Sequence, residues 1–251
     1  MKQDTLKQLE AYDTATITNV VGTYPNDPKT CLGLYNPWTV NWYTDQRLRC
    51  VFPDLGPRAG YAVTVQYGMP DANYRRLGFD DVLRAIEASS KPVILVLRQN
   101  LPKQYLQKNG LCGTNMTAAM KALGCIGVVT DGPCRDIREI RDLDFQYLLT
   151  GVCAGHGDFA VEAVNIPVSV SGMDVTPGEI VHMDENGACK FPAAYSEQVL
   201  SLAEKLSRIE EKRIGSLSRC TRAEEVIRIL GGFEGSAEEE SDRKGERDAS
   251  V

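Results

Sequence analysis

Short apolar runs separated by turn residues recur along the middle of the chain and predict strands. The runs at 92–97 and 126–129 contain no charge, which is typical of strands covered on both faces of a sheet. The segment 61–65 is equally apolar, and 164–170 and 179–183 follow later, the last two separated by the turn residues Pro177 and Gly178. The strand positions therefore continue through most of the chain.

Segments with helical spacing or composition alternate with these runs. We expect them at 4–23, 80–88, 114–123, a short stretch from Asp136, 196–212 and 222–230. Asp13 or Thr14 is a plausible cap within the first, Asp80 for the second, and Gly124 ends the third. Alternating strands and helices predict an α/β domain.

Two segments depart from this alternation. Residues 24–59 are rich in Pro, Gly and Asn and contain both Trp38 and Trp42, so we interpret them as an irregular insertion that packs as a lid rather than as a contact surface. Residues 235–251 are highly charged and almost free of apolar side chains, which predicts a disordered tail. The expected organisation is a single domain over 1–233 followed by this tail.

Composition and charge argue against a nucleic-acid-binding protein and against a membrane-spanning one. Hydrophobic residues make up 43% and charged residues 25% of the 251 residues, as in ordinary globular proteins. The net charge of -6 is spread along the chain without a basic stripe, so we expect no nucleic-acid partner. The longest apolar run, at 92–97, is too short for a membrane span. Small molecules or other proteins are the expected partners.

Cysteine usage and the polar first residues favour a cytoplasmic location. The chain has eight cysteines, mostly within apolar stretches and without a C-x-x-C pair, so we expect free thiols that pack as small hydrophobic groups. The start, Met1-Lys2-Gln3-Asp4, lacks the apolar core of a signal peptide. Reduced cysteines are usual in the cytoplasm.

The segment from Gly113 to Asp136 carries the most chemical information. Gly113 precedes an expected helix whose first amides have no partner within the helix, and such amides bind anions. One strand later, Arg135 offers a planar fork that fits a carboxylate, and Asp136 is a hard oxygen ligand suited to Mg²⁺ or Mn²⁺. Taken alone, an Arg-Asp pair more often forms a salt bridge and an N-cap at the start of a helix.

The wider spacing resembles the signature of the RraA-like family. The matching positions are Gly113, Gly124, Gly127, Asp131, Gly132, Arg135 and Asp136, in order and without a gap. Segments 14–19, 60–65, 164–168 and 175–179 also resemble that family, so the likeness covers roughly 10–212 without the insertion. It implies a swivelling β/β/α domain with a central mixed sheet flanked by helices. The family includes ribonuclease regulators and metal-dependent 4-hydroxy-4-methyl-2-oxoglutarate aldolases, which also decarboxylate oxaloacetate.

The resemblance implies a role for each matching residue. Arg135 would hold the carboxylate of a small anionic 2-keto acid, and Asp136 would bind the divalent metal, Mg²⁺ or Mn²⁺. Gly113 and the backbone amides of Asn115 and Met116 would complete the substrate site. Cleavage next to the keto group would leave a pyruvate enolate, whose charge a metal can stabilise. The family also implies assembly as a homotrimer or hexamer.

One position departs from the family pattern. Catalytic members carry an acidic residue directly after the first glycine, where this chain has Thr114. A threonine hydroxyl forms hydrogen bonds but is no base near neutral pH. We group Thr114 with Arg135 and Asp136 as candidate catalytic residues. Two functions stay open: a metal-dependent lyase of the aldolase or decarboxylase type, and a non-catalytic regulatory protein on the same scaffold.

Four further residues are candidates for a chemical role, and for each a structural role is the more common one. His156 lies in a Gly-rich stretch, where a surface loop histidine is more common than a proton donor, and His182 is expected to be structural. Cys134 is more commonly an inert buried thiol than a nucleophile. Asp131 is expected to cap its own turn rather than to act as a catalyst.

Overall fold

A mixed eight-stranded sheet forms the centre of the computed structural model, which describes residues 2–22, 30–36, 38–73 and 77–231. Seven of its strands follow the order β1-β5-β4-β3-β2-β9-β10, and β6 pairs with β2. The bounds of these eight strands are β1 Arg49–Cys50, β2 Arg58–Gly68, β3 Val93–Asn100, β4 Cys125–Thr130, β5 Gln146–Leu149, β6 Ala160–Val164, β9 Ile180–Asp184 and β10 Gly187–Phe191. A separate two-stranded sheet joins β7 Val168–Val170 and β8 Met173–Val175.

The four middle strands, β2 to β5, run parallel to one another. Val63 of β2 pairs with Leu95 of β3, which in turn pairs with Val128 of β4. The outer strands β1, β6, β9 and β10 pair antiparallel to their neighbours. The carboxyl ends of β3, β4 and β5 consequently meet at one edge of the sheet, where α/β proteins tend to place ligand sites.

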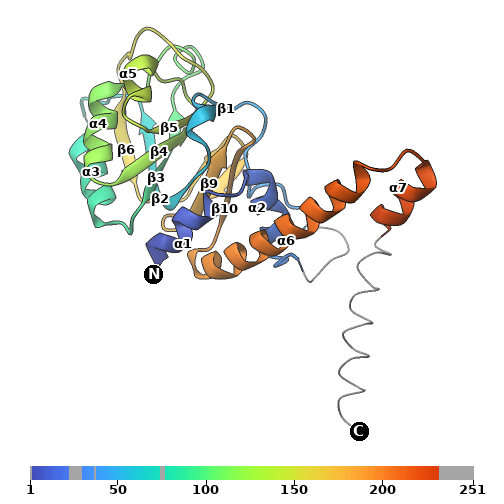
Figure 1. Cartoon of the computed structure of the whole chain (residues 1–251). Coiled ribbons are helices and arrows are strands. Elements are labelled where there is room, and N and C mark those ends of the chain that lie inside the picture. Colours follow the sequence, from blue (N-terminus) through green and yellow to red (C-terminus); the bar gives the residue numbers. More distant parts are fainter. Residues whose placement is uncertain (1, 23–29, 37, 74–76, 232–251) are drawn as a thin grey trace. The chain divides into compact units, whose positions relative to one another are not determined.

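Alternate residues of these strands enter two hydrophobic clusters on the two faces of the sheet. On one face, Leu95 and Val128 pack with Val82 of α3 (Phe79–Ala88) and Met120 of α4 (Thr114–Ala122). Figure 1 shows α3 and α4 side by side against this part of the sheet. On the other face, Ile94, Val96 and Val129 pack with apolar residues of β7, β8 and β9. Coverage of both faces explains the uninterrupted apolar runs.

The expected helix over 4–23 is two helices, α1 Lys2–Leu9 and α2 Thr14–Val21. Asp13 interrupts it because its backbone is extended, and its carboxylate accepts the Thr16 amide at 2.7 Å as a cap. The Thr14 amide instead donates to the buried Asp184 carboxylate at 2.6 Å. His182 is structural, as expected: both ring nitrogens bond within the N-terminal region, to the Thr14 hydroxyl and the Leu9 carbonyl, and burial lowers its pKa.

Two other element boundaries differ from expectation, and a third agrees with it. Gly78 rather than Asp80 is the N-cap of α3, and its amide donates to the Asp81 carboxylate at 2.8 Å. The segment 164–170 is not one strand, because Asn165 adopts a left-handed backbone (φ 55°) between β6 and β7. The expected helix end at Gly124 is confirmed by its positive φ of 87°, which favours glycine.

The insertion is mostly irregular, as expected, with the short strand β1 and a single 3-10 turn, Pro53–Leu55, in its described part. Its two tryptophans differ: Trp42 is buried and stacks on Tyr35 at 4.9 Å between ring centroids, whereas Trp38 is exposed. The burial expected of both side chains is therefore found for Trp42 and not for Trp38, and the role of the insertion as a lid stays a prediction. Residues 23–29 of this insertion lie outside the described residues.

Contacts divide the chain into two compact units, Met1–Ala203 and the part from Glu204 onward. Helix α6, Ser196–Leu217, begins in the first unit, where Val199 and Ala203 are buried, and α7 spans Ala223–Leu230. A single domain over 1–233 stays a prediction, and the expected disordered tail at 235–251 lies outside the described residues.

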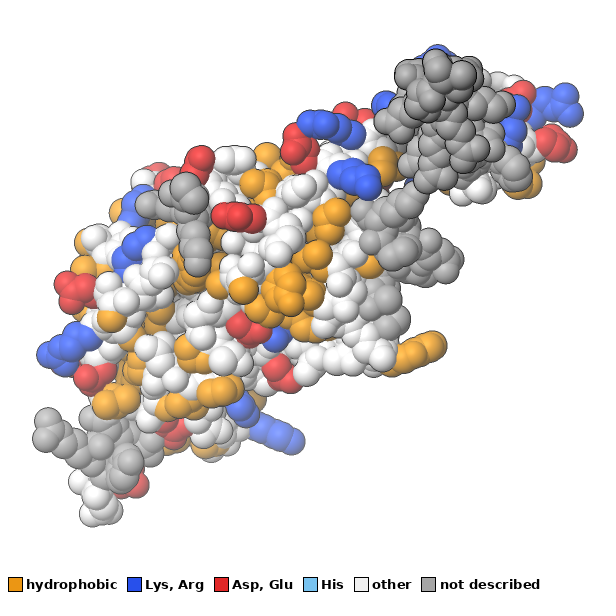
Figure 2. All heavy atoms as spheres, turned by 90° about the horizontal axis from the view of Figure 1, so that it is seen from below, with side chains coloured by type: hydrophobic (Ala, Val, Ile, Leu, Met, Phe, Trp, Pro, Cys, Tyr) orange, Lys and Arg blue, Asp and Glu red, His pale blue; other side chains and the backbone are white. Residues whose placement is uncertain are grey.

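All eight cysteines are free thiols, as expected. Basic and acidic side chains are interspersed on the face shown in Figure 2, rather than gathered by sign. Among the described helices, none combines the length and the apolar character needed to span a bilayer.

Candidate functional site

Two segments distant in sequence meet at the carboxyl edge of β4. The Leu111 amide donates to the Pro133 carbonyl at 2.9 Å, and the Arg135 amide donates to the Cys112 carbonyl at 3.2 Å. These bonds align the chain before α4 with the chain before α5, Ile137–Arg141. Gly113, which begins α4, thereby lies beside the Arg135–Asp136 pair.

A third segment, the loop after β5, completes this edge. The Cys134 amide donates to the Gly151 carbonyl at 3.1 Å, and the Cys153 amide donates back to the Cys134 carbonyl at 3.0 Å. The Gly110 amide reaches the Gly155 carbonyl at 3.0 Å. From this loop the sequence analysis considered only His156, because it did not identify β5. The apolar run Tyr147–Leu149 before a Gly-rich stretch was the available signal.

Asp136 connects the two helix starts in an unexpected way. Its backbone is left-handed (φ 61°, ψ 36°), and its carboxylate forms no capping bond with α5. Its Oδ2 atom instead accepts the Thr114 amide at 3.0 Å, across 22 positions of sequence. Asp136 therefore caps α4 and not the helix that follows it. The cap interpretation from sequence was right about the bond type and wrong about the helix.

Arg135 lies against the same carboxylate without being enclosed by it. Its Nε atom is 3.5 Å from Asp136 Oδ2, and the two side chains are 36% and 34% exposed. A Cβ atom on Gly113 would lie 2.6 Å from Asp136 Oδ2 and 3.2 Å from Arg135 Nε. The close approach of the guanidinium and the carboxylate to α4 consequently requires glycine at position 113.

The first turn of α4 presents its amides next to this pair. Thr117 fixes the turn, because its hydroxyl bonds both the Gly113 carbonyl at 2.9 Å and the buried Tyr147 hydroxyl at 2.7 Å. Thr114 and Met116 are half-buried and Asn115 is exposed. The amides of Asn115 and Met116 have no carbonyl one turn earlier within the helix. They are the amides that an anion at this edge would meet.

Asp131 does not cap its own turn. Its Oδ1 atom accepts the Gln99 amide at 2.8 Å, which ties the end of β4 to β3, while the Thr130 hydroxyl accepts the Gly132 amide at 3.1 Å. Burial raises the pKa of Asp131 to about 6, against the opposing effects of this hydrogen bond and of Arg98 and Arg47. A carboxylate that binds its proton more tightly when folded destabilises the folded state at neutral pH.

We expect Asp131→Asn to stabilise the protein above pH 7. Asparagine keeps an oxygen for the Gln99 amide but removes the buried charge. The folded pKa of about 6 exceeds the ordinary aspartate pKa of 3.8, so the contribution of the protonated carboxyl to stability is complete below pH 4 and is lost as pH rises through 6. The variant should gain about 2 kcal/mol at pH 8 and about half as much at pH 5, measured by urea unfolding. An equal gain at both pH values would contradict this assignment.

The remaining candidates differ in their relation to the site. Cys134 is fully buried, and burial raises its thiol pKa, so it fits the inert role expected of it. His156 is exposed, with Nδ1 3.0 Å from the Gly157 carbonyl oxygen. The thiol of Cys153 lies close to Gly110, and burial raises its pKa while Arg135 lowers it. Cys153 is therefore a neighbour of Arg135 that the sequence analysis did not identify.

The candidate site contains one carboxylate that could bind a metal ion, that of Asp136, and no complete set of protein ligands among the described residues. No cluster of three or more His, Cys, Asp or Glu side chains suited to a metal exists among the described residues. Asp136 is partly exposed beside Thr114. Mg²⁺ commonly binds through one or two carboxylates, with water and substrate oxygens completing its shell. A single Asp136 carboxylate is compatible with Mg²⁺ bound in this way. It is not sufficient for a structural metal site, in which protein side chains supply all the ligands.

Comparisons with known proteins agree on one family. A family model described as "RraA-like: Aldolase/RraA" matches residues 39–189. A protein of Halalkalibacterium halodurans named "Putative 4-hydroxy-4-methyl-2-oxoglutarate aldolase" is 30% identical over 109 residues, or 43% of this chain and 52% of that protein. The chain thus matches about half the length of this curated relative.

Solved structures extend the likeness to the fold. An uncharacterized protein from Pseudomonas syringae pv. tomato superposes with a TM-score of 0.67 at 20% identity, over 89% of this chain and 92% of that one. Streptomyces coelicolor RraAS2, described as an unusual member of the RNase ES inhibitor RraA protein family, superposes with a TM-score of 0.57 at 21% identity, over 83% and 94% of the two chains. The expected α/β fold, a mixed sheet flanked by helices, is confirmed.

Proposed function

The chain belongs to the RraA-like family, and from this premise we propose that it is a divalent-metal-dependent carbon–carbon lyase acting on a small 2-keto acid. One observation carries the proposal: a guanidinium, a carboxylate and the start of α4 converge at one edge of the sheet. The aldolase name of the curated relative supports the reaction class.

Arg135 is the proposed carboxylate-binding residue. Its guanidinium contacts Asp136 through Nε and is partly exposed, so its outer nitrogens can form a two-point contact with a substrate carboxylate. The first amides of α4 lie beside it and add preorganised positive potential. Together they would hold a 2-keto acid in one orientation and stabilise negative charge that develops on its keto oxygen.

Asp136 is the proposed metal ligand. The Thr114 amide fixes the orientation of its carboxylate. A bound Mg²⁺ or Mn²⁺ would act as a Lewis acid toward the keto oxygen during cleavage to a pyruvate enolate. Asp136 thus has two roles in the proposal, because it holds the ion and it caps α4.

Thr114 sets the limit of the proposed chemistry. It stands where catalytic relatives carry an acid, and its hydroxyl can orient a substrate or a water molecule without accepting a proton at neutral pH. Decarboxylation of oxaloacetate needs no base to begin, because loss of carbon dioxide itself leaves the enolate. We therefore propose decarboxylation as the better retained activity, and aldol cleavage, which requires removal of a hydroxyl proton, as the weaker one.

The test is pyruvate release from oxaloacetate by the full-length protein. Release should rise above the protein-free rate with Mg²⁺ or Mn²⁺ and fall to that rate with excess chelator. A panel of other 2-keto acids would define the substrate. Absence of turnover on every member, together with an unchanged melting temperature on addition of metal, would refute the lyase proposal.

The second candidate is a non-catalytic regulatory or binding protein, as among the ribonuclease regulators of the family. Thr114 favours it, because the position lacks the acid of the catalytic relatives. This candidate predicts a stable fold, no metal-dependent turnover and retained binding of a protein partner at the same edge. The oxaloacetate assay separates the two candidates directly.

Assembly and location are also proposals. RraA-like proteins commonly oligomerise, and we propose a homotrimer or a hexamer in the cytoplasm with no nucleic-acid or membrane partner. Light scattering should give a mass three or six times the 27.6 kDa of one chain. A mass near one chain would exclude this assembly.

A further inference from the structure

A cavity of about 620 Å³ opens at the edge of the sheet opposite the candidate site. Its wall includes Arg58 at the start of β2, Pro92 before β3 and Ile126 near the start of β4. The candidate site lies instead at the carboxyl ends of β3, β4 and β5. The size is within the usual range for small-ligand sites, and the two sites cannot share a ligand.

The charged groups of this cavity balance in sign. Three basic and three acidic side chains line it: Lys7, Arg58, Lys121, Asp4, Glu10 and Asp144. A simple anion or cation finds no net charge to complement it here. A molecule that carries both an ammonium group and a carboxylate complements this wall, because each of its charged ends can meet side chains of opposite sign.

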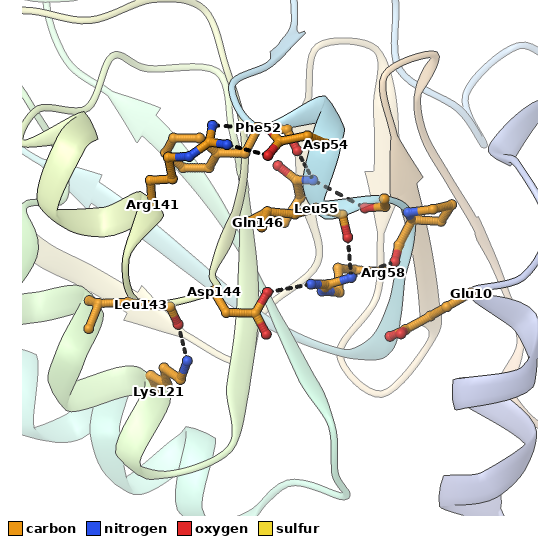
Figure 3. Close-up of polar contacts among 12 residues, drawn as sticks. Glu10, Phe52, Asp54, Leu55, Arg58, Lys121, Arg141, Leu143, Asp144 and Gln146 are labelled. Atoms are coloured by element: carbon orange, nitrogen blue, oxygen red, sulfur yellow. Dashed lines mark hydrogen bonds and ion pairs between the residues drawn. The ribbon is translucent and has the colours of Figure 1, made fainter.

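Arg58 gives the cavity a rigid wall. Its side chain is only 13% exposed and donates to the Leu55 carbonyl at 2.7 Å, the Pro57 carbonyl at 3.1 Å and the Asp144 carboxylate at 2.7 Å. Figure 3 shows the guanidinium between Asp144 and the Leu55 carbonyl, with Glu10, the residue directly after α1, reaching toward it. A guanidinium held by three groups needs little reorganisation when a ligand arrives.

Glu10 is the group most available for exchange. Its carboxylate is 8% exposed, and its ion-pair partner Lys7, 2.6 Å away, is 76% exposed. Because Lys7 is so exposed, its side chain can move into solvent, but the buried Glu10 carboxylate then needs another cation as its partner. The other contact of Glu10, from the Ala59 amide, is long at 3.4 Å. A ligand ammonium can therefore take the place of Lys7 at small cost, which frees that lysine for a ligand carboxylate.

We propose that this cavity binds a small zwitterion of the amino-acid class. The ligand ammonium contacts Glu10, and its carboxylate contacts the exposed lysines Lys7 and Lys121. An apolar side chain of the ligand lies against Pro92 and Ile126. The proposal does not depend on the lyase activity, because it uses none of the residues of the candidate site.

Helix α4 connects this cavity with the candidate site. Lys121, in its last turn, lines the cavity and donates to the Leu143 carbonyl, as Figure 3 shows. Thr114, its first residue, donates to Asp136. A ligand that draws Lys121 away from Leu143 acts on a helix whose other end is bonded to the proposed metal ligand.

Calorimetric titration of the full-length protein with three matched compounds tests the proposal. L-phenylalanine carries both charges, 3-phenylpropanoate only the carboxylate and phenethylamine only the ammonium. L-phenylalanine should bind saturably and at least about tenfold more tightly than either analogue. Glu10→Gln keeps an oxygen for the Ala59 amide and should weaken binding about tenfold, and Lys121→Met should weaken it as well. Glu87→Gln, at an exposed position of α3, is the matched control and should bind normally.

Several results would overturn the proposal. Equal affinity for L-phenylalanine and 3-phenylpropanoate would make this a simple anion site. Unchanged affinity in both Glu10→Gln and Lys121→Met, with melting temperatures showing that both variants are folded, would place the ligand elsewhere. Loss of binding in Arg135→Met would assign it to the candidate site. Absence of saturable binding by all three compounds would remove the zwitterion class.

Discussion

Replacing Asp136 with asparagine should reduce Mg²⁺-dependent pyruvate release from oxaloacetate by at least about 100-fold. Asparagine keeps an oxygen acceptor for the Thr114 amide and tolerates the left-handed backbone of this position. The α4 cap should therefore survive while the negative charge that would hold the ion is lost. Initial rates across a Mg²⁺ titration, with the melting temperature measured in parallel, give the comparison.

Alanine at position 136 separates the two proposed roles of the aspartate. Asp136→Ala removes the charge and the cap together and also places alanine in a left-handed backbone, so it should lose activity as Asp136→Asn does and lose about 2 kcal/mol of stability or more. Asp142→Ala, at an exposed aspartate one residue beyond α5, is the matched control and should leave both quantities unchanged. Full metal-dependent activity in Asp136→Asn would contradict the role of Asp136 as metal ligand.

Replacing Gly113 with alanine should abolish most activity with little loss of stability. The added Cβ would lie 2.6 Å from Asp136 Oδ2 and 3.2 Å from Arg135 Nε, so both side chains must move. Both groups are the far ends of partly exposed side chains, and they can turn toward solvent without disturbing the core. We expect a fall in kcat/KM of about 100-fold, because misplacement by about 1 Å has effects of this size.

Gly151→Ala is the control for this substitution. Gly151 lies in the loop that joins the same edge of the sheet, and a Cβ there meets nothing within 4 Å. This variant should keep both activity and melting temperature. Equal activity in Gly113→Ala and the parent protein would show that the convergence of Arg135, Asp136 and α4 is not needed for the reaction.

The apolar patterning predicted the centre of the fold correctly, for a physical reason. The central parts of β3 and β4, 93–97 and 125–129, are covered on both faces, so consecutive positions there carry no polar side chain and the pattern is visible in a single sequence. Strands β1, β5, β6, β8 and β10 escaped detection. β1 has two residues, and β5 is a four-residue strand whose first residue is the buried polar Gln146. Such short segments depend on their neighbours in the sheet more than on their own composition.

The sequence by itself determined which residues were the main candidates, Gly113, Thr114, Arg135 and Asp136, because glycines, an arginine and an aspartate at defined spacing are properties of the chain. Only the tertiary structure decided that Asp136 caps α4 and that the Asp131 carboxylate accepts the Gln99 amide. It alone also revealed the charged cavity at the opposite edge of the sheet. Each of these depends on a contact between segments distant along the chain. A hydrogen bond across 22 residues leaves no local pattern, since its geometry arises only when the sheet has brought its strands into register.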